Sequence, residues 1–227
     1  MALWNLGENF YLKPSKDSPV KLFLNDFDNN GEKEKIITRT IDGKDKPVFM
    51  KSELESQLPM LKKQNLRNAD FAKKSVQELF NEAQMKNVQV SEVNYSSSCI
   101  AFNNGKGQFS ISKLPAAVQL SSVKSVLPFD VNGDGLPDLV LGGNEFGFHP
   151  ELGRLDAGTE NLLINKGRGI FLPTGLQSGL ELPGQLRDIV PLKRKNAPVI
   201  LFLQNNEFPK LYGLKAITQG STIIKKK

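Results

Sequence analysis

Residues 129–144, FDVNGDGLPDLVLGGN, place oxygen-bearing side chains at alternate positions directly before an apolar run. Numbered from the first aspartate, the donors at positions 1, 3, 5 and 9 are Asp130, Asn132, Asp134 and Asp138, and the backbone carbonyl of Leu136 stands at position 7. A nine-residue loop can aim oxygens from these positions at a common centre, and Ca²⁺ accepts about six to eight oxygens at about 2.3–2.6 Å. Because the carboxylates repel one another, the spacing predicts a calcium ion among them.

A second acidic loop, earlier in the chain, has the same spacing. In FLNDFDNNGEKEKIIT the equivalent ligands are Asp26, Asp28, Asn30, the carbonyl of Glu32, and Glu34. In both loops a glycine follows the fifth position, where a sharp turn favours a residue that can take positive φ. Residues 130–138 are the stronger match, and Glu34 is a longer terminal ligand than Asp138, so the two sites are expected to differ in affinity. The sequence therefore predicts two calcium sites.

The two loops are not EF-hands, although an EF-hand begins in the same way. An EF-hand needs a bidentate Glu at position 12 and a helix on each side. Position 12 is Leu141 counted from Asp130 and Ile37 counted from Asp26, and both stand in strand-like segments. The alternative that stays open is that both loops are ordinary Asn/Gly/Asp turns between strands.

Few other residues could support chemistry. Cys99 is the only cysteine and His149 the only histidine, whereas disulfides, zinc sites and catalytic triads need partners. The alternative of an enzyme, a propeller-type subunit acting on polysaccharide or in a redox reaction, would have to use Glu145, Glu151 and Asp156, which form no recognisable acid pair. We therefore expect a protein that is not an enzyme, with no catalytic residue and no cofactor except calcium.

The net charge of +6 permits a further alternative, a basic protein that binds polyanions. Its lysines are mostly scattered, which is typical of solvated surfaces, so nucleic acid is not an expected partner. No run of eighteen apolar residues is present, so no membrane span is expected. The N-terminus lacks the pattern of a signal peptide.

Short segments rich in β-branched and aromatic residues indicate strands at both ends of the chain. From about residue 52 to 85 the pattern changes to helix, and the pairs Ser52/Glu55 and Ser75/Glu78 fit capping boxes. We interpret 52–85 as a helical insertion into a β-rich fold, too short to hold a core of its own.

Internal repeats predict the architecture. IAFNNGKGQFSI resembles LLINKGRGIFLP, and each unit of about sixty residues holds two hairpins, enough for one four-stranded sheet. A sheet of this kind repeated radially is a propeller blade. The predicted fold is mostly β: a single domain of about three four-stranded β-propeller blades over residues 20–115, 116–175 and 176–216, with the helical insertion in the first. In the third, Asp188 stands where the acidic loop would begin, but lysines follow it, so no site is expected there.

The motifs DVNGDGLPDLVLGG and DFDNNGEKEKIIT resemble the FG-GAP/VCBS repeats of the integrin-alpha head and of many bacterial secreted proteins. NNGKGQF and NKGRGIF resemble the hairpin that accompanies those repeats. With residues 43–80 and GRLDAG, the chain is similar to a bacterial VCBS-repeat subfamily related to the cartilage acidic protein.

This resemblance implies a β-propeller with structural calcium, located outside the cell, in the periplasm or at the cell surface in the parent protein. It implies recognition or adhesion, with loops presented to a protein or glycan ligand. Such propellers usually have seven blades, so the remaining blades of a longer parent chain are a further expected partner. The connection at residues 145–156, with two aromatics and His149, is the best candidate for a ligand-facing loop.

Overall fold

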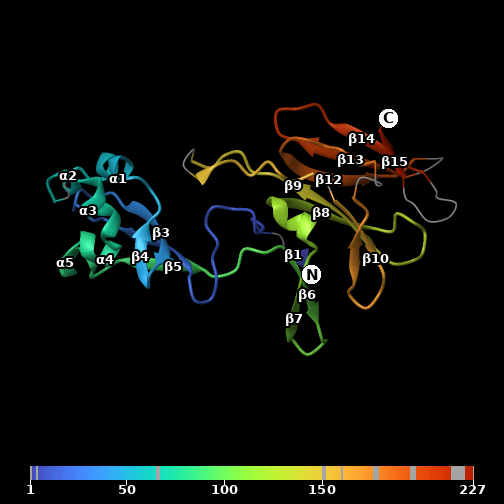
Figure 1. Ribbon diagram of the computed structural model, residues 1–227. Helices are drawn as coiled ribbons and strands as arrows, with labels where there is room; N and C mark the ends of the chain where they lie inside the picture. Colours follow the sequence, from blue (N-terminus) through green and yellow to red (C-terminus); the bar gives the residue numbers. More distant parts are fainter. Residues whose placement is uncertain are drawn as a thin grey trace. The chain divides into compact units, whose positions relative to one another are not determined.

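The computed structural model describes residues 2–3, 5–64, 67–149, 152–159, 161–175, 179–194, 198–215 and 223–226 (Figure 1). The fold is mostly β, as predicted, and its strand pairs are antiparallel. Where a single domain was expected, the chain divides into two compact units. Unit 1 comprises Met1–Tyr11 and Ser97–Lys227, and unit 2 comprises Leu12–Ser96.

Unit 2 is a four-stranded sheet with helices packed against it. The strands are β2 (Val20–Asn25), β3 (Glu34–Ile41), β4 (Lys44–Pro47) and β5 (Gln89–Val93), in the order β4-β3-β2-β5. Between β4 and β5 lie the short helices α1 (Lys51–Gln57), α2 (Leu61–Gln64), α3 (Asn68–Lys73), α4 (Val76–Leu79) and α5 (Glu82–Met85), on one side of the sheet in Figure 1. The predicted helical insertion is therefore confirmed.

The helix starts follow the predicted capping in one case of two. At α4, the backbone N–H of Ser75 donates to Glu78 Oε2 over 2.7 Å, as the Ser75/Glu78 pair predicts. At α1, the N–H of Met50 donates instead to Glu53 Oε2 over 3.0 Å. The Ser52/Glu55 box was wrong because Glu55 is buried and pairs with Lys51.

Unit 2 has a core of its own, to which both the helical insertion and the sheet contribute. The apolar stripe formed by Leu54 of α1, Leu58 directly after it and Leu61 of α2 is fully buried. It packs against Phe23 and Ile36, which come from the sheet. Helices alone have too little apolar surface for a core, and here strands β2 and β3 supply the rest. The compact unit is therefore residues 12–96, and the helical insertion 52–85 is one part of it.

Unit 1 contains three sheets among its described residues. The first has the order β1-β6-β7, from β1 (Ala2–Leu3), β6 (Cys99–Asn103) and β7 (Phe109–Lys113). After the short 3₁₀ helix η1 (Ala116–Leu120), the second sheet is β8 (Val123–Phe129), β9 (Asp138–Gly143), β10 (Asn161–Asn165) and β11 (Phe171–Pro173). The third is β12 (Leu186–Leu192), β13 (Val199–Gln204), β14 (Lys210–Lys215) and β15 (Ile223–Lys226).

The three predicted four-stranded segments match the observed sheets to different extents. Residues 116–175 contain the whole of the second sheet, and the third sheet extends beyond the expected end at residue 216. The strands of residues 20–115 belong instead to two different sheets. The reason is that β1 pairs with β6 in the way that β9 pairs with β10. In the sequence, unit 2 therefore lies between β1 and β6, the position that the connection between β9 and β10 has in the second sheet.

The second sheet is buried on both faces. Side chains alternate between the faces of a strand, and the neighbours Leu139 and Val140 of β9 belong to different apolar clusters. Leu139 packs with Ile100 of β6, and Val140 packs with Ile200 of β13. The three sheets are thus joined by two apolar layers, but the described residues form no closed propeller. None of the described helices has the length and apolar character needed to cross a membrane.

Candidate metal centre

Both acidic loops connect antiparallel strands in the same register. Asn25 pairs with Glu34 across the first loop, and Phe129 pairs with Asp138 across the second. Residues 26–34 and 130–138 therefore occupy equivalent positions, and the last residue of each loop is the first residue of a strand. This agrees with the predicted equivalence of the loops.

The first carboxylate of each loop organises the backbone in the same way. Asp26 Oδ2 accepts from the N–H of Gly31 over 2.9 Å, and Asp130 Oδ2 accepts from the N–H of Gly135 over 2.9 Å. The other oxygen accepts from the N–H at position 5, in Asn30 at 3.0 Å and in Asp134 at 3.2 Å. These bonds lie across the turn.

The middle of each loop repeats this agreement. The side chain at position 5 accepts from the N–H at position 7. Asn30 Oδ1 accepts from the N–H of Glu32 over 2.7 Å, and Asp134 Oδ1 accepts from the N–H of Leu136 over 2.8 Å. At position 6 both glycines have positive φ, 93° at Gly31 and 83° at Gly135, as their placement predicted. The two loops have the same fold.

Position 2, which the ligand pattern ignores, anchors each loop in a core. Its N–H donates to the carboxylate at position 9, from Phe27 to Glu34 Oε2 at 2.9 Å and from Val131 to Asp138 Oδ2 at 3.0 Å. Its side chain is buried, at 0% exposure for Phe27 and 7% for Val131. Sequence reasoning missed this role, although an apolar residue between two candidate ligands, at positions 1 and 3, was the signal for it.

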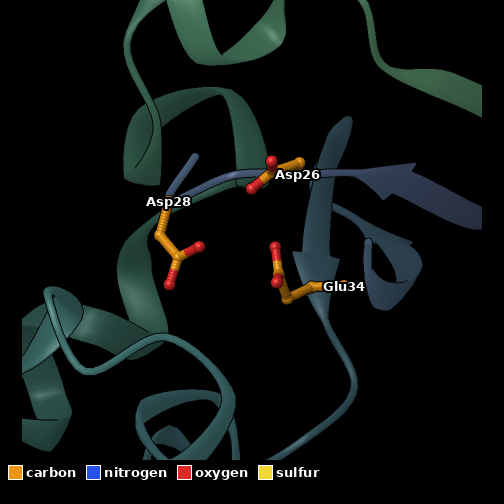
Figure 2. Close-up of side chains that lie close together, drawn as sticks. All are labelled: Asp26, Asp28 and Glu34. Atoms are coloured by element: carbon orange, nitrogen blue, oxygen red, sulfur yellow. The ribbon is translucent and has the colours of Figure 1, made fainter. Parts of the chain in front are cut away.

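The first loop brings three carboxylates together (Figure 2). One oxygen from each of Asp26, Asp28 and Glu34 lies within 4.8 Å of the others. Glu34 is buried, and the two aspartates are half-buried. Carboxylates so close together repel one another, and hard oxygen donors are the ligands that calcium prefers. The residues present therefore fit a divalent cation.

The second loop does not gather its carboxylates in this way. Among the described residues, Asp130, Asp134 and Asp138 do not form a group of three with oxygens so close. Asp138 is fully buried and its Oδ1 accepts from the N–H of Asn165 in β10 over 2.8 Å. Asp134 Oδ2 accepts from Asn132 Nδ2 over 2.9 Å. Here the predicted ligands bond to one another and to β10.

The electrostatics of the second loop differ along its length. Hydrogen bonds from backbone N–H groups, that of Gly135 first, lower the pKa of Asp130. Burial raises the pKa of Asp138, and the charges of Asp134 and Asp130 add to this effect, although the N–H groups of Asn165 and Val131 oppose it. A cation between these groups would favour the charged form of all three.

In the third repeat, the counterpart of the acidic loops does not lie at the predicted position. Asp188 lies inside strand β12 and accepts a hydrogen bond from Ser125 Oγ over 3.0 Å, so its equivalence to Asp130 was wrong. The true counterpart is the connection from Leu192 to Val199, which pair with each other. Residues 193–198, KRKNAP, contain no carboxylate.

The acids considered for an enzyme have structural partners where they are described. Glu145 pairs with Lys124 and accepts from Gln185 Nε2 over 3.0 Å. Asp156 pairs with Arg154, whose guanidinium lies 4.1 Å from the ring centre of Phe146. Glu151 lies outside the described residues. Glu145 and Asp156 are thus both held in ion pairs.

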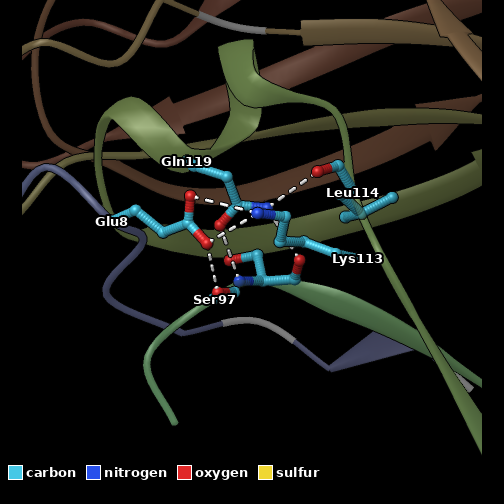
Figure 3. Close-up of polar contacts among 6 residues, drawn as sticks. Glu8, Ser97, Lys113, Leu114 and Gln119 are labelled. Carbon is cyan, nitrogen blue, oxygen red and sulfur yellow. Dashed lines mark hydrogen bonds and ion pairs between the residues drawn. The ribbon is translucent and has the colours of Figure 1, made fainter. Parts of the chain in front are cut away.

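One further polar cluster in unit 1 also has a structural arrangement (Figure 3). Glu8 accepts from Ser97 Oγ over 2.6 Å and pairs with Lys113 over 3.0 Å. The amide of Gln119 bonds the backbone of Ser98 in both directions and donates to the carbonyl of Leu114 over 3.0 Å. These bonds join the two segments that flank unit 2 in the sequence, near Glu8 and Ser97, to strand β7 and to the segment that follows it.

No family model matches the chain, and neither a search of curated proteins nor a search of solved structures found a match. The FG-GAP/VCBS resemblance therefore stays a prediction from the motifs, and function has to follow from the residues themselves.

Proposed function

We propose that this protein is a non-enzymatic calcium-binding module in which the ion is structural. The observation that carries the proposal is the group Asp26, Asp28 and Glu34, with oxygens within 4.8 Å of one another. It stands on a loop whose hydrogen bonds recur in residues 130–138. Two copies of one loop geometry, at least one with converging carboxylates, favour a cation over ordinary turns.

The ligands of the first site would be Asp26, Asp28 and Glu34, with Asn30 and the carbonyl of Glu32 completing the set. When bound, calcium would supply positive charge among the carboxylates and nothing more. The chain's own residues do the rest: the loop ties β2 to β3, and Phe27 anchors it in the core of unit 2. The second site would use Asp130, Asn132, Asp134, the Leu136 carbonyl and Asp138.

We further propose that the three sheets of unit 1 are blades of a β-propeller that presents loops to a protein or glycan outside the cell. Two observations support this: sheets β8–β11 and β12–β15 have strands in sequential order, and apolar layers join neighbouring sheets. Further blades would come from a longer parent chain. The motifs that resemble FG-GAP/VCBS repeats support the same proposal.

The decisive experiment is a calorimetric calcium titration of chelator-treated protein, with Asp28→Asn and Asp134→Asn as variants that remove one loop each. Asp42→Asn, in the neighbouring turn between β3 and β4, is the control for losing a carboxylate. We expect each loop variant to lose its own site and the control to bind like the wild type. Absence of binding at millimolar calcium would overturn the proposal.

A further inference from the structure

Gln84 of α5 contacts the first acidic loop although it lies fifty residues beyond it in the chain. Its Oε1 accepts from the N–H of Asn81 over 3.0 Å, and its own N–H donates to Asn81 Oδ1 over 3.0 Å, which closes a capping box at the start of α5. This fixes the side-chain amide of Gln84. Its Nε2 then donates to the carbonyl of Phe27 over 2.7 Å.

A second bond joins the same helix to the loop from the other side of Asp26. Asn25, the last residue of β2, donates from Nδ2 to the backbone carbonyl of Gln84 over 2.6 Å. Gln84 is therefore bonded to both neighbours of the first candidate ligand. The ring of Phe27 adds an apolar contact, since it stacks on Phe80 with 4.3 Å between ring centroids and is fully buried.

The amide plane of Phe27 connects Gln84 to another candidate ligand. The carbonyl of Phe27 accepts from Gln84, while its N–H donates to Glu34 Oε2 over 2.9 Å. One oxygen of Glu34 is thereby placed by a residue that the helix holds. In the second loop the outside restraint comes from Asn165 and acts directly on Asp138. Only the first loop thus has a helix bonded to its position 2 among the described contacts.

We propose that Gln84 is a positioning residue for the first calcium site and that it couples ion binding to the attachment of α5. The inference rests on the proposed function, because it needs calcium to bind residues 26–34. Coupling of this kind is reciprocal: if the bonds of Gln84 raise the affinity for the ion, the ion strengthens those bonds to the same extent.

The affinity test compares Gln84→Met with Glu78→Met in full-length protein that also carries Asp134→Asn, so that calcium titration reports the first loop. Both substitutions remove the glutamate or glutamine of a capping box, but only Gln84 bonds the loop. Loss of one hydrogen bond predicts about three- to tenfold weaker calcium binding in Gln84→Met. Glu78→Met is expected to bind like its parent.

The coupling test is amide hydrogen exchange with calcium and with chelator. In the wild type we expect calcium to slow exchange severalfold over residues 76–88 and to leave residues 97–113 unchanged. In Gln84→Met the calcium effect over 76–88 is expected to become smaller although the ion still binds, because only the bond from Asn25 to the backbone of Gln84 and the stacking of Phe27 on Phe80 remain. A residue with only a structural role would change exchange equally in both conditions.

The outcomes separate this inference from the proposed function. If the parent does not bind calcium, the proposed function fails and the inference fails with it. If calcium binds, but Gln84→Met has parental affinity and exchange over 76–88 ignores the ion, only the inference is overturned. Should Gln84→Met not fold, Asn25→Ala removes the second bond and is expected to weaken binding in the same direction; parental affinity in that variant would overturn the inference.

Discussion

The two acidic loops share a backbone and differ in what their last residue contacts. Both close with a hydrogen bond from position 2 to the carboxylate at position 9. Glu34 has one more methylene than its counterpart and lies with Asp26 and Asp28, whereas Asp138 is fully buried and accepts a further bond from Asn165. The comparison teaches that spacing specifies the loop, while the neighbouring strand decides where the carboxylates lie.

The loops also differ in the core that anchors them. Phe27 stacks on Phe80 beneath the helices of unit 2, whereas Val131 belongs to the apolar cluster between the second and third sheets of unit 1. Phe27 is a larger side chain than Val131, and unit 2 is smaller than unit 1. We therefore expect the first loop and its core to depend on each other more strongly than the second loop and its core do. Three predictions test this difference, beginning with the largest effect.

The anchors are expected to differ in energetic weight. Phe27→Ala should destabilise unit 2 by about 3–5 kcal/mol, because it removes a fully buried ring and leaves a cavity. Val131→Ala should destabilise unit 1 by at most about 1.5–3 kcal/mol, the value of burying a whole valine side chain. Denaturant unfolding, followed by hydrogen exchange in each unit, measures both.

The matched control for the loss of an aromatic ring is Phe208→Ala, at an exposed position. Tyr11→Ala would not serve, because Tyr11 has contacts of its own. Phe208 is 91% exposed, and its loss should change stability by less than about 0.5 kcal/mol. Equal costs for Phe27→Ala and Val131→Ala would remove the asymmetry between the loops.

The length of the terminal ligand is the next difference to test. Glu34→Asp makes the first loop end as the second does, so its carboxylate should no longer reach the other two. We expect calcium affinity at the first loop to fall about tenfold, equivalent to about 1.4 kcal/mol. Glu32→Asp shortens an exposed side chain whose predicted contribution is only its carbonyl, and calorimetry should find it unchanged. A Glu34→Asp protein with wild-type affinity would show that the extra methylene is irrelevant.

The loops could be predicted from the sequence because their structure is local. Asp26, Gly31 and Glu34 lie within nine residues of one another, and the hydrogen bonds within the loop join residues at most seven apart. The hairpins could be predicted for the same reason: Lys166 donates to Ile170 over 2.8 Å, and Asn104 donates to Gln108 over 3.0 Å.

What could not be predicted depends on contacts between distant residues. The boundary of unit 2 follows from the pairing of Leu3 with Cys99, which no local pattern reveals. The arrangement of Asp138 depends on Asn165, on a strand that follows a seventeen-residue connection. The role of Gln84 likewise depends on how α5 packs. Spacing therefore predicted the candidate ligands but not which set would converge.

The smallest expected effect is a pH dependence within the second loop. The pKa of Asp130 is lowered, so its contribution to stability is present above the unfolded-state pKa, about 3.9, and is lost as the pH falls through the lower folded-state value. The pKa of Asp138 is raised, so the folded protein takes up that proton first and gains stability as the pH falls through the folded value. The two contributions oppose each other.

Carboxyl NMR titration in chelator should therefore find Asp138 protonating above, and Asp130 below, the ordinary range for aspartate. In the wild type the two effects partly cancel, so the free energy of unfolding should change little in acid from this loop alone. Asp130→Asn should remove the loss of stability that Asp130 contributes as the pH falls. If Asp138 protonated below Asp130, burial would not be the dominant influence on this carboxyl, and the contrast between a buried terminal Asp and a converging terminal Glu would lose its electrostatic basis.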